Sequence, residues 1–107
     1  MLDLSKLTQP DVRKAIEALQ QGNKSDWRAS FSAHPTLTDD GAPRSFARFT
    51  EDALGHERFT SIDRIENGGL HIYGSFHSDR WGDFKTFFKF HAAGDGKFER
   101  LDIGQAD

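Results

Sequence analysis

The second half of the chain constrains the fold most, because its apolar and polar residues alternate with a period of two. Strand-like runs cover residues 59–65, 70–78, 83–91 and 97–103. Turn signals separate these runs at Asn67-Gly68-Gly69, at residues 79–82 and at Gly94-Asp95-Gly96. Four such runs joined by three short turns predict an antiparallel meander.

The first half follows the helical period instead. Residues 11–21 carry apolar side chains at helical spacing, namely Val12, Ala15, Ile16 and Leu19. Pro10 suits the first turn of this helix and Gly22 suits its end. Helices followed by strands are typical of the α+β class.

Two further helices are expected before the meander. Asn23 or Ser25 can cap a short second helix that places Trp27 and Phe31 on one face and breaks at His34-Pro35. A short strand at 36–38 and a turn at 39–43 should follow. Pro43 then opens a third helix that runs to about Leu54.

Length and composition limit the function classes. The 107 residues form one domain, 1–107, and the net charge of −3 argues against a nucleic-acid partner. The absence of cysteine excludes disulfides, thiolate zinc sites and cysteine nucleophiles. No apolar run approaches the roughly 20 residues of a membrane span, and no signal peptide is recognisable, so we expect no membrane association and a cytoplasmic location.

The meander separates its side chains onto two faces. The apolar face, expected to meet the helices, carries Leu70, Ile72, Gly74, Phe76, Phe84, Thr86, Phe88, Phe90, Leu101 and Ile103. The other face is mixed and includes Tyr73, His77 and Phe87. An amphipathic face with aromatic residues is typical of a homodimer contact, although a solvated sheet face is the simpler interpretation.

The order of these elements resembles the nuclear transport factor 2 superfamily, and most closely its small bacterial SnoaL-like members. The resemblance covers nearly the whole chain. It rests on Ala18-Leu19-Gln20-Gln21-Gly22-Asn23, on Asp26-Trp27 with Phe31, on Leu37-Thr38-Asp39 before a turn, and on the four-run meander. It implies a cystatin-like cone: three N-terminal helices packed on a curved four-stranded antiparallel sheet, with one additional short strand.

The resemblance extends to the ketosteroid isomerases, which allows a comparison of catalytic positions. It places Asp39 at the general base, Ala15 at the tyrosine donor and Thr86 at the aspartate donor. One oxyanion donor is then absent and the other is at best a hydroxyl, which disfavours a steroid isomerase. His34 is a candidate partner of Asp39.

Asp39 and Asp40 also have a plain structural interpretation. Asp-Asp-Gly is ordinary turn chemistry, and either carboxylate can cap the third helix. The sequence does not decide which of the two would be functional.

The family resemblance implies an apolar cavity among the helices and the sheet. Its expected lining is Trp27, Phe31, Phe49, Ile72, Phe76, Phe84, Phe88, Leu101 and Ile103. The expected function is therefore binding of a small apolar ligand, with a cofactor-independent isomerase, cyclase or dehydratase step at Asp39 as its catalytic form. The alternative is a non-enzymatic homodimeric module whose ten phenylalanines fill the core. Trp81 is expected either to cover the cone or to anchor its hairpin.

The histidines do not form a metal site by spacing. His71 and His77 share a strand face but are six residues apart, roughly 20 Å along a strand. We therefore expect no metal and no cofactor.

Overall fold

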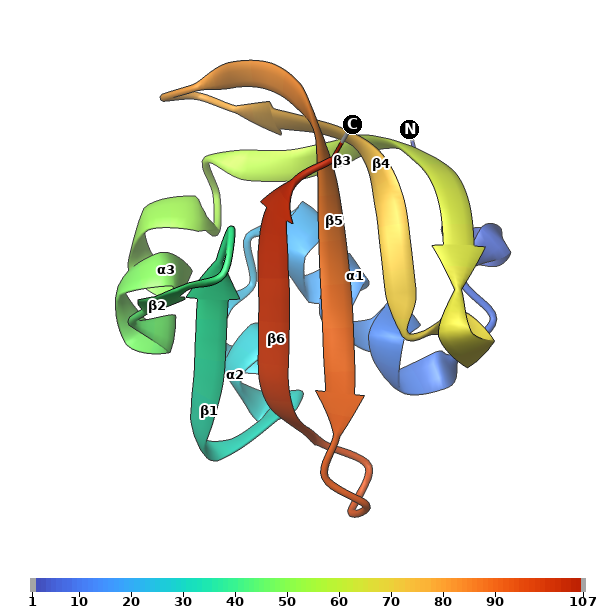
Figure 1. The fold of residues 1–107 in the computed structure, drawn as a ribbon, viewed down its shortest axis with the longest axis vertical. Coiled ribbons are helices and arrows are strands. Elements are labelled where there is room, and N and C mark those ends of the chain that lie inside the picture. Colours follow the sequence, from blue (N-terminus) through green and yellow to red (C-terminus); the bar gives the residue numbers. More distant parts are fainter. Residues whose placement is uncertain (1, 107) are drawn as a thin grey trace.

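The computed structural model describes residues 2–106, which form a layer of helices against a curved sheet (Figure 1). The helices are η1 (Leu4–Lys6), α1 (Pro10–Gln21), α2 (Lys24–Ala29), α3 (Phe46–Ala53) and η2 (Asn67–Gly69), where η marks a 3-10 helix. The strands are β1 (Phe31–Asp39), β2 (Ala42–Arg44), β3 (Glu57–Glu66), β4 (His71–Ser78), β5 (Gly82–Ala92) and β6 (Phe98–Gln105).

The sheet is mixed rather than antiparallel. Its strand order is β2-β1-β6-β5-β4-β3, and β1 runs parallel to β6 while every other pair is antiparallel. The predicted meander is confirmed as β3–β6, and the α+β class is confirmed with it. The predicted four strands plus one short strand are corrected to six, because both β1 and β2 join the sheet.

The first helix agrees with the sequence prediction, and the next two differ at their ends. Gly22 ends α1 in the left-handed region with φ 68°. Helix α2 stops at Ala29, so Phe31 and His34 lie on β1 and not on a helix. Pro43 belongs to β2, and Ser45 rather than an aspartate caps α3 by accepting a bond from the Arg48 N–H.

Two glycines permit close contacts within the sheet. A side chain at Gly74 would lie 2.0 Å from the Ser61 carbonyl oxygen, where β3 shifts register against β4. A side chain at Gly104 would collide with the Phe87 ring and the Asp40 carboxylate. Irregular pairing of this kind bends strands, and the sheet is visibly curved in Figure 1.

The core lies between the helices and the concave face of the sheet. Strand β4 buries every second residue, as the period of two predicts. Trp27 is fully buried and donates its indole N–H to Thr50 Oγ1 at 3.1 Å. Its ring contacts Phe31, Phe46 and Phe49, which joins α2, β1 and α3 into one aromatic cluster.

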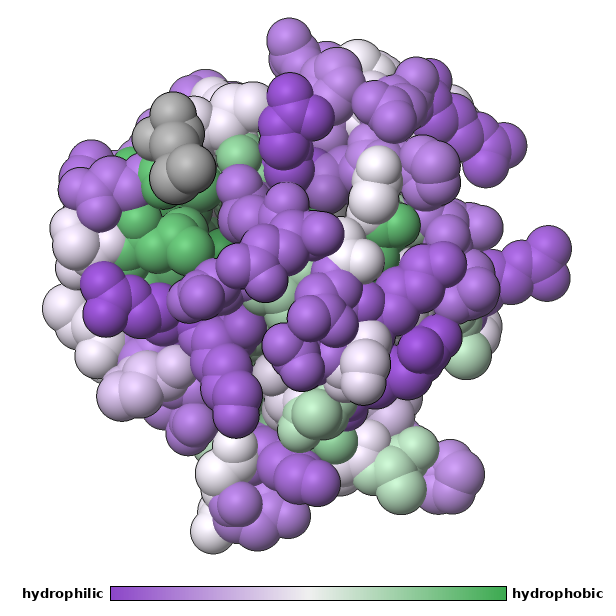
Figure 2. All heavy atoms as spheres, turned by 180° about the vertical axis from the view of Figure 1, so that it is seen from behind, coloured by the Kyte–Doolittle hydropathy of each residue, from purple (hydrophilic) through white to green (hydrophobic). Residues whose placement is uncertain are grey.

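Seen from the helical side, the surface is largely hydrophilic (Figure 2). An apolar area appears where η1 and β3 lie together, and the groove there includes Leu2, Leu4, Phe59 and Ile62. Within residues 2–106, no helix has the length and hydropathy needed to span a bilayer.

Candidate functional site

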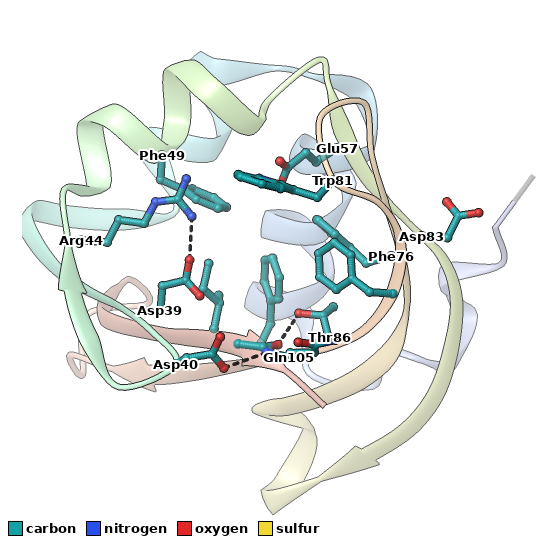
Figure 3. Close-up of a pocket in the computed structure, with 14 residues that line it drawn as sticks. Asp39, Asp40, Arg44, Phe49, Glu57, Phe76, Trp81, Asp83, Thr86 and Gln105 are labelled. Atoms are coloured by element: carbon teal, nitrogen blue, oxygen red, sulfur yellow. Dashed lines mark hydrogen bonds and ion pairs between the residues drawn. The ribbon is translucent and has the colours of Figure 1, made fainter. Parts of the chain in front are cut away.

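A cavity of about 470 Å³ opens where β1, β2, α3 and the start of β3 meet the β4–β5 turn. Figure 3 shows its main lining side chains. The lining residues are Asp39, Asp40, Arg44, Phe49, Glu57, Phe76, Trp81, Asp83, Phe84, Thr86, Phe88, Ile103, Gly104 and Gln105. Five aromatic rings thus form part of the wall, and charged groups stand around the cavity.

Asp39 is the last residue of β1 and faces the cavity. It pairs across the sheet with Ile103, which in turn pairs with Phe88. The turn at Asp40-Gly41, with both φ angles positive as in a type I′ hairpin, folds β2 back along β1. Arg44 Nη1 therefore donates to Asp39 Oδ2 at 2.9 Å, and neither side chain is fully buried.

Asp40 has a different role from its neighbour. Its backbone adopts φ 51°, and its Oδ1 accepts the backbone N–H of Gln105 at 2.9 Å. The carboxylate thus fixes the turn to the end of β6 at the cavity rim. Of the two aspartates left open by the sequence, Asp39 is the one that contacts a charged group inside the cavity (Figure 3).

Thr86 is buried in the cavity wall, but its proton is already used. The hydroxyl donates to the Gly104 carbonyl oxygen at 2.6 Å. Ala15, at the position of the family's tyrosine, is buried in α1 and is not among the cavity-lining residues. Neither position therefore presents a free donor to a developing oxyanion.

The sequence analysis missed Glu57, as it missed the lining residues Arg44, Asp83, Gly104 and Gln105. Glu57 opens β3, and its Oε2 accepts a hydrogen bond from Ser78 Oγ at 3.0 Å. Burial raises the pKa of its carboxyl, with the Ser78 hydrogen bond and the Arg44 charge opposing that shift. No motif marks Glu57; only its position, at the start of the strand that leads into the meander, distinguishes it.

Ser78 ties Glu57 to the turn that carries Trp81. This buried hydroxyl accepts the backbone N–H groups of Arg80 and Trp81 at 3.2 and 3.0 Å. Trp81 is 67% exposed, and it lines the cavity together with Glu57 (Figure 3). The Arg80 guanidinium lies 4.9 Å from the centre of the Trp81 indole.

The expected cavity lining divides into two groups. Phe49, Phe76, Phe84, Phe88 and Ile103 line the cavity together with Asp39 and Thr86. Trp27, Phe31, Ile72 and Leu101 lie in the core and are not among the lining residues. The division follows the sheet's length, since the cavity occupies only the end where β1 stops.

His34 is not placed near Asp39. It is exposed in the irregular part of β1, between the paired residues Phe31 and Thr36, and it does not line the cavity. Among residues 2–106, no group of three or more His, Asp and Glu side chains is arranged to hold a metal ion.

The outer face of the sheet carries the residues expected at a dimer contact. Tyr73 and Phe87 are cross-strand partners with ring centroids 6.5 Å apart. Arg64 lies 4.0 Å over the Tyr73 ring and Lys89 lies 4.9 Å over the Phe87 ring. His77 contacts Asp79 and Asp83, and these hydrogen bonds raise its pKa. Self-association through this face stays a prediction.

Comparison with known proteins finds similarity at the level of structure. No family model and no curated protein matches the chain. An NTF2-like protein of unknown function from Cytophaga hutchinsonii has TM-score 0.70 and 13% identity over 99% of this chain and 92% of that one. A candidate polyketide cyclase from Sinorhizobium meliloti has TM-score 0.72 and 14% identity over 94% and 98% of the two chains.

A candidate ketosteroid isomerase from Kribbella flavida is similar to the same extent. Its TM-score is 0.71 and its identity 14%, over 95% of this chain and 79% of that one. At sequence identities this low, the structural similarity shows a shared fold but does not show a shared activity. The chain therefore has the NTF2-like fold that the resemblance of its sequence implied.

Proposed function

We propose that this protein binds a small, largely apolar molecule in the cavity bounded by Asp39, Phe76 and Trp81. The observation that carries the proposal is the open volume of about 470 Å³ with phenylalanine walls. Ligand sites are commonly concave, with apolar walls and a few polar groups. This cavity is concave and combines five aromatic wall residues with four carboxylates and Arg44. The alternative of a core filled by phenylalanine is supported less, since five aromatic side chains line the cavity rather than fill it.

The polar groups support binding more than carbanion chemistry. Asp39 is available as a base in the cavity, but it is engaged by Arg44. The Thr86 hydroxyl donates to the backbone, and His34 lies elsewhere. An isomerase, cyclase or dehydratase step at Asp39 would lack the usual donors for an enolate oxygen, and the loss of one such donor commonly costs on the order of 10²–10³ in rate.

The proposal is tested by titrating the protein with a neutral solvatochromic dye such as Nile red. Ile103→Trp places an indole in the cavity, and we expect it to weaken dye binding at least about tenfold, or about 1.4 kcal/mol. Ile65→Trp makes the same change away from the cavity lining and should leave binding unchanged. Equal affinity in all three proteins, or no binding by the wild type, would contradict the proposal.

A further inference from the structure

The polar groups that face the cavity are mainly hydrogen-bond acceptors. Three carboxylates, those of Asp39, Asp40 and Glu57, surround it, whereas Arg44 is the single basic residue of the described lining. Asp83 also belongs to the lining, but its carboxylate points away (Figure 3) and contacts His77. The cavity therefore has an excess of negative charge on a chain of net charge −3.

Two donors of the cavity, on Arg44 and Thr86, are already engaged, whereas several carboxylate oxygens are not. Arg44 is directed to Asp39 Oδ2 and lies 5.1 Å from the centre of the Phe49 ring. Thr86 donates to Gly104. Within residues 2–106, Glu57 accepts its bond at Oε2 and Asp39 at Oδ2, which leaves Oε1 and Oδ1 without a hydrogen bond. These free carboxylate oxygens favour a ligand that carries hydrogen-bond donors of its own.

Aromatic faces stand beside these carboxylates. Trp81, Phe49 and Phe76 line the same cavity as Glu57 (Figure 3). Aromatic faces attract cations through their quadrupole, and tryptophan does so most strongly. Burial raises the pKa of Glu57, so a cation placed beside that carboxyl would offset part of its desolvation.

We propose that the ligand of this cavity is a cationic amine with an apolar body, whose ammonium group lies between the Glu57 carboxylate, Asp39 and the face of Trp81. The apolar body would then contact Phe76, Phe84 and Phe88 deeper in the cavity. This assignment rests on the proposed binding function and names the chemical class of its ligand.

An anionic ligand fits the same groups poorly. Its carboxylate or phosphate would compete with Asp39 for Arg44 and would approach Glu57 as a like charge. A neutral ligand would gain the apolar contacts alone. The charge of the ligand is therefore the property to vary.

The test compares three probes with nearly the same apolar body: phenethylamine, phenethyl alcohol and hydrocinnamate. Binding is followed by chemical-shift changes of the cavity residues at neutral pH and constant ionic strength, because salt screens charge interactions. We expect the amine to bind at least about tenfold more tightly than the alcohol, as one charged hydrogen bond provides, and hydrocinnamate to bind most weakly.

Two variants test whether the preference for the amine arises from Glu57 and Trp81. Glu57→Gln keeps the shape of the side chain and removes its charge, and it should reduce the amine-to-alcohol ratio to within about threefold while the alcohol binds as before. Glu99→Gln makes the same change at an exposed position of β6 outside the cavity and should preserve the ratio. Trp81→Leu should weaken the amine more than the alcohol, and it provides a second test if Glu57→Gln is misfolded.

The outcomes separate the two proposals. Failure of all three probes and of the neutral dye would overturn the binding function and this assignment with it. Binding of the alcohol or of hydrocinnamate as tightly as the amine would overturn the assignment alone. An amine preference that survives both Glu57→Gln and Trp81→Leu would also overturn it, because the preference would then arise elsewhere.

Discussion

The Glu57 carboxyl links the cavity to the stability of the fold. Burial raises its pKa above the ordinary value of 4.5, so the folded protein keeps a proton in a pH range where the unfolded chain has lost it. Stability therefore falls as the pH rises through that range. Its charged neighbours are Arg44, Asp39 and Asp52, which reach it from β2, β1 and α3.

Glu57→Gln should remove this pH dependence. Near pH 4.5 and below, the variant and the wild type should unfold at similar denaturant concentrations. As the pH rises, the variant should become progressively more stable than the wild type, until Glu57 is fully ionised and the difference levels off. Urea denaturation of both proteins between about pH 4 and pH 8 measures the difference. A constant difference over that range would contradict the assigned pKa direction.

The two tightly packed glycines give a second prediction for single residues. Gly74→Ala would place Cβ against the backbone oxygen of Ser61, which cannot rotate away, and should cost more than ~2 kcal/mol. Gly104→Ala meets the Phe87 ring and the Asp40 carboxylate, which are side chains, and should cost about 1 kcal/mol. Urea denaturation of the two variants compares these costs, and the reverse order would show that the bulge in β3 adjusts more easily than the Phe87 ring.

Sequence reasoning identified only some of the residues of the site. The alignment with a known family brought attention to Asp39 and Thr86, which the structure places on neighbouring parts of one wall. It could not reveal that the Thr86 proton is used by Gly104, because that bond depends on the register of β5 and β6. Glu57 was missed because it lies two residues before the predicted start of the strand at Phe59, where a charged residue is ordinary.

At the scale of the elements, one buried hydrogen bond connects α2 with α3. The Trp27 indole N–H donates to Thr50 Oγ1, and Thr50 in turn donates to the Phe46 carbonyl oxygen. Thr50→Val keeps the volume and removes the acceptor, which leaves a buried N–H without a partner. We expect a loss of about 1–2 kcal/mol in the free energy of unfolding. Thr60→Val, at an exposed position of β3, is the control and should change stability little.

Elements with a clear local pattern were predicted well. The alternation of β4 and the apolar stripe of α1 follow from the residues themselves, and both are confirmed. The first residues of β1, up to His34, were predicted to be helical, because Trp27 and Phe31 are at helical spacing and the helix was expected to end at His34-Pro35. Its extended form depends on pairing with β6, some 60 residues later in the chain, and Pro35 lies in the stretch where that pairing is irregular.

At the scale of the whole molecule, the open question is self-association. If a second copy covers the outer face of the sheet, sedimentation at micromolar concentration should give a dimer. Phe87→Asp should then shift it to a monomer, because a charge would be buried beside Tyr73. Trp81→Asp makes a comparable change at the cavity mouth and should leave the dimer intact. A wild-type monomer would contradict the prediction while leaving the cavity proposals unaffected.

The parallel pairing of β1 with β6 also affects how the protein is made. During synthesis the chain emerges from its N-terminus, so β1 and Asp39 are complete long before Ile103 exists. Until residues 98–105 follow, β1 has only the short β2 beside it and an unpaired edge on its other side. The wall that joins Asp39 to Thr86 is therefore assembled last, and a nascent chain has its helices and most of its meander before it can hold a ligand.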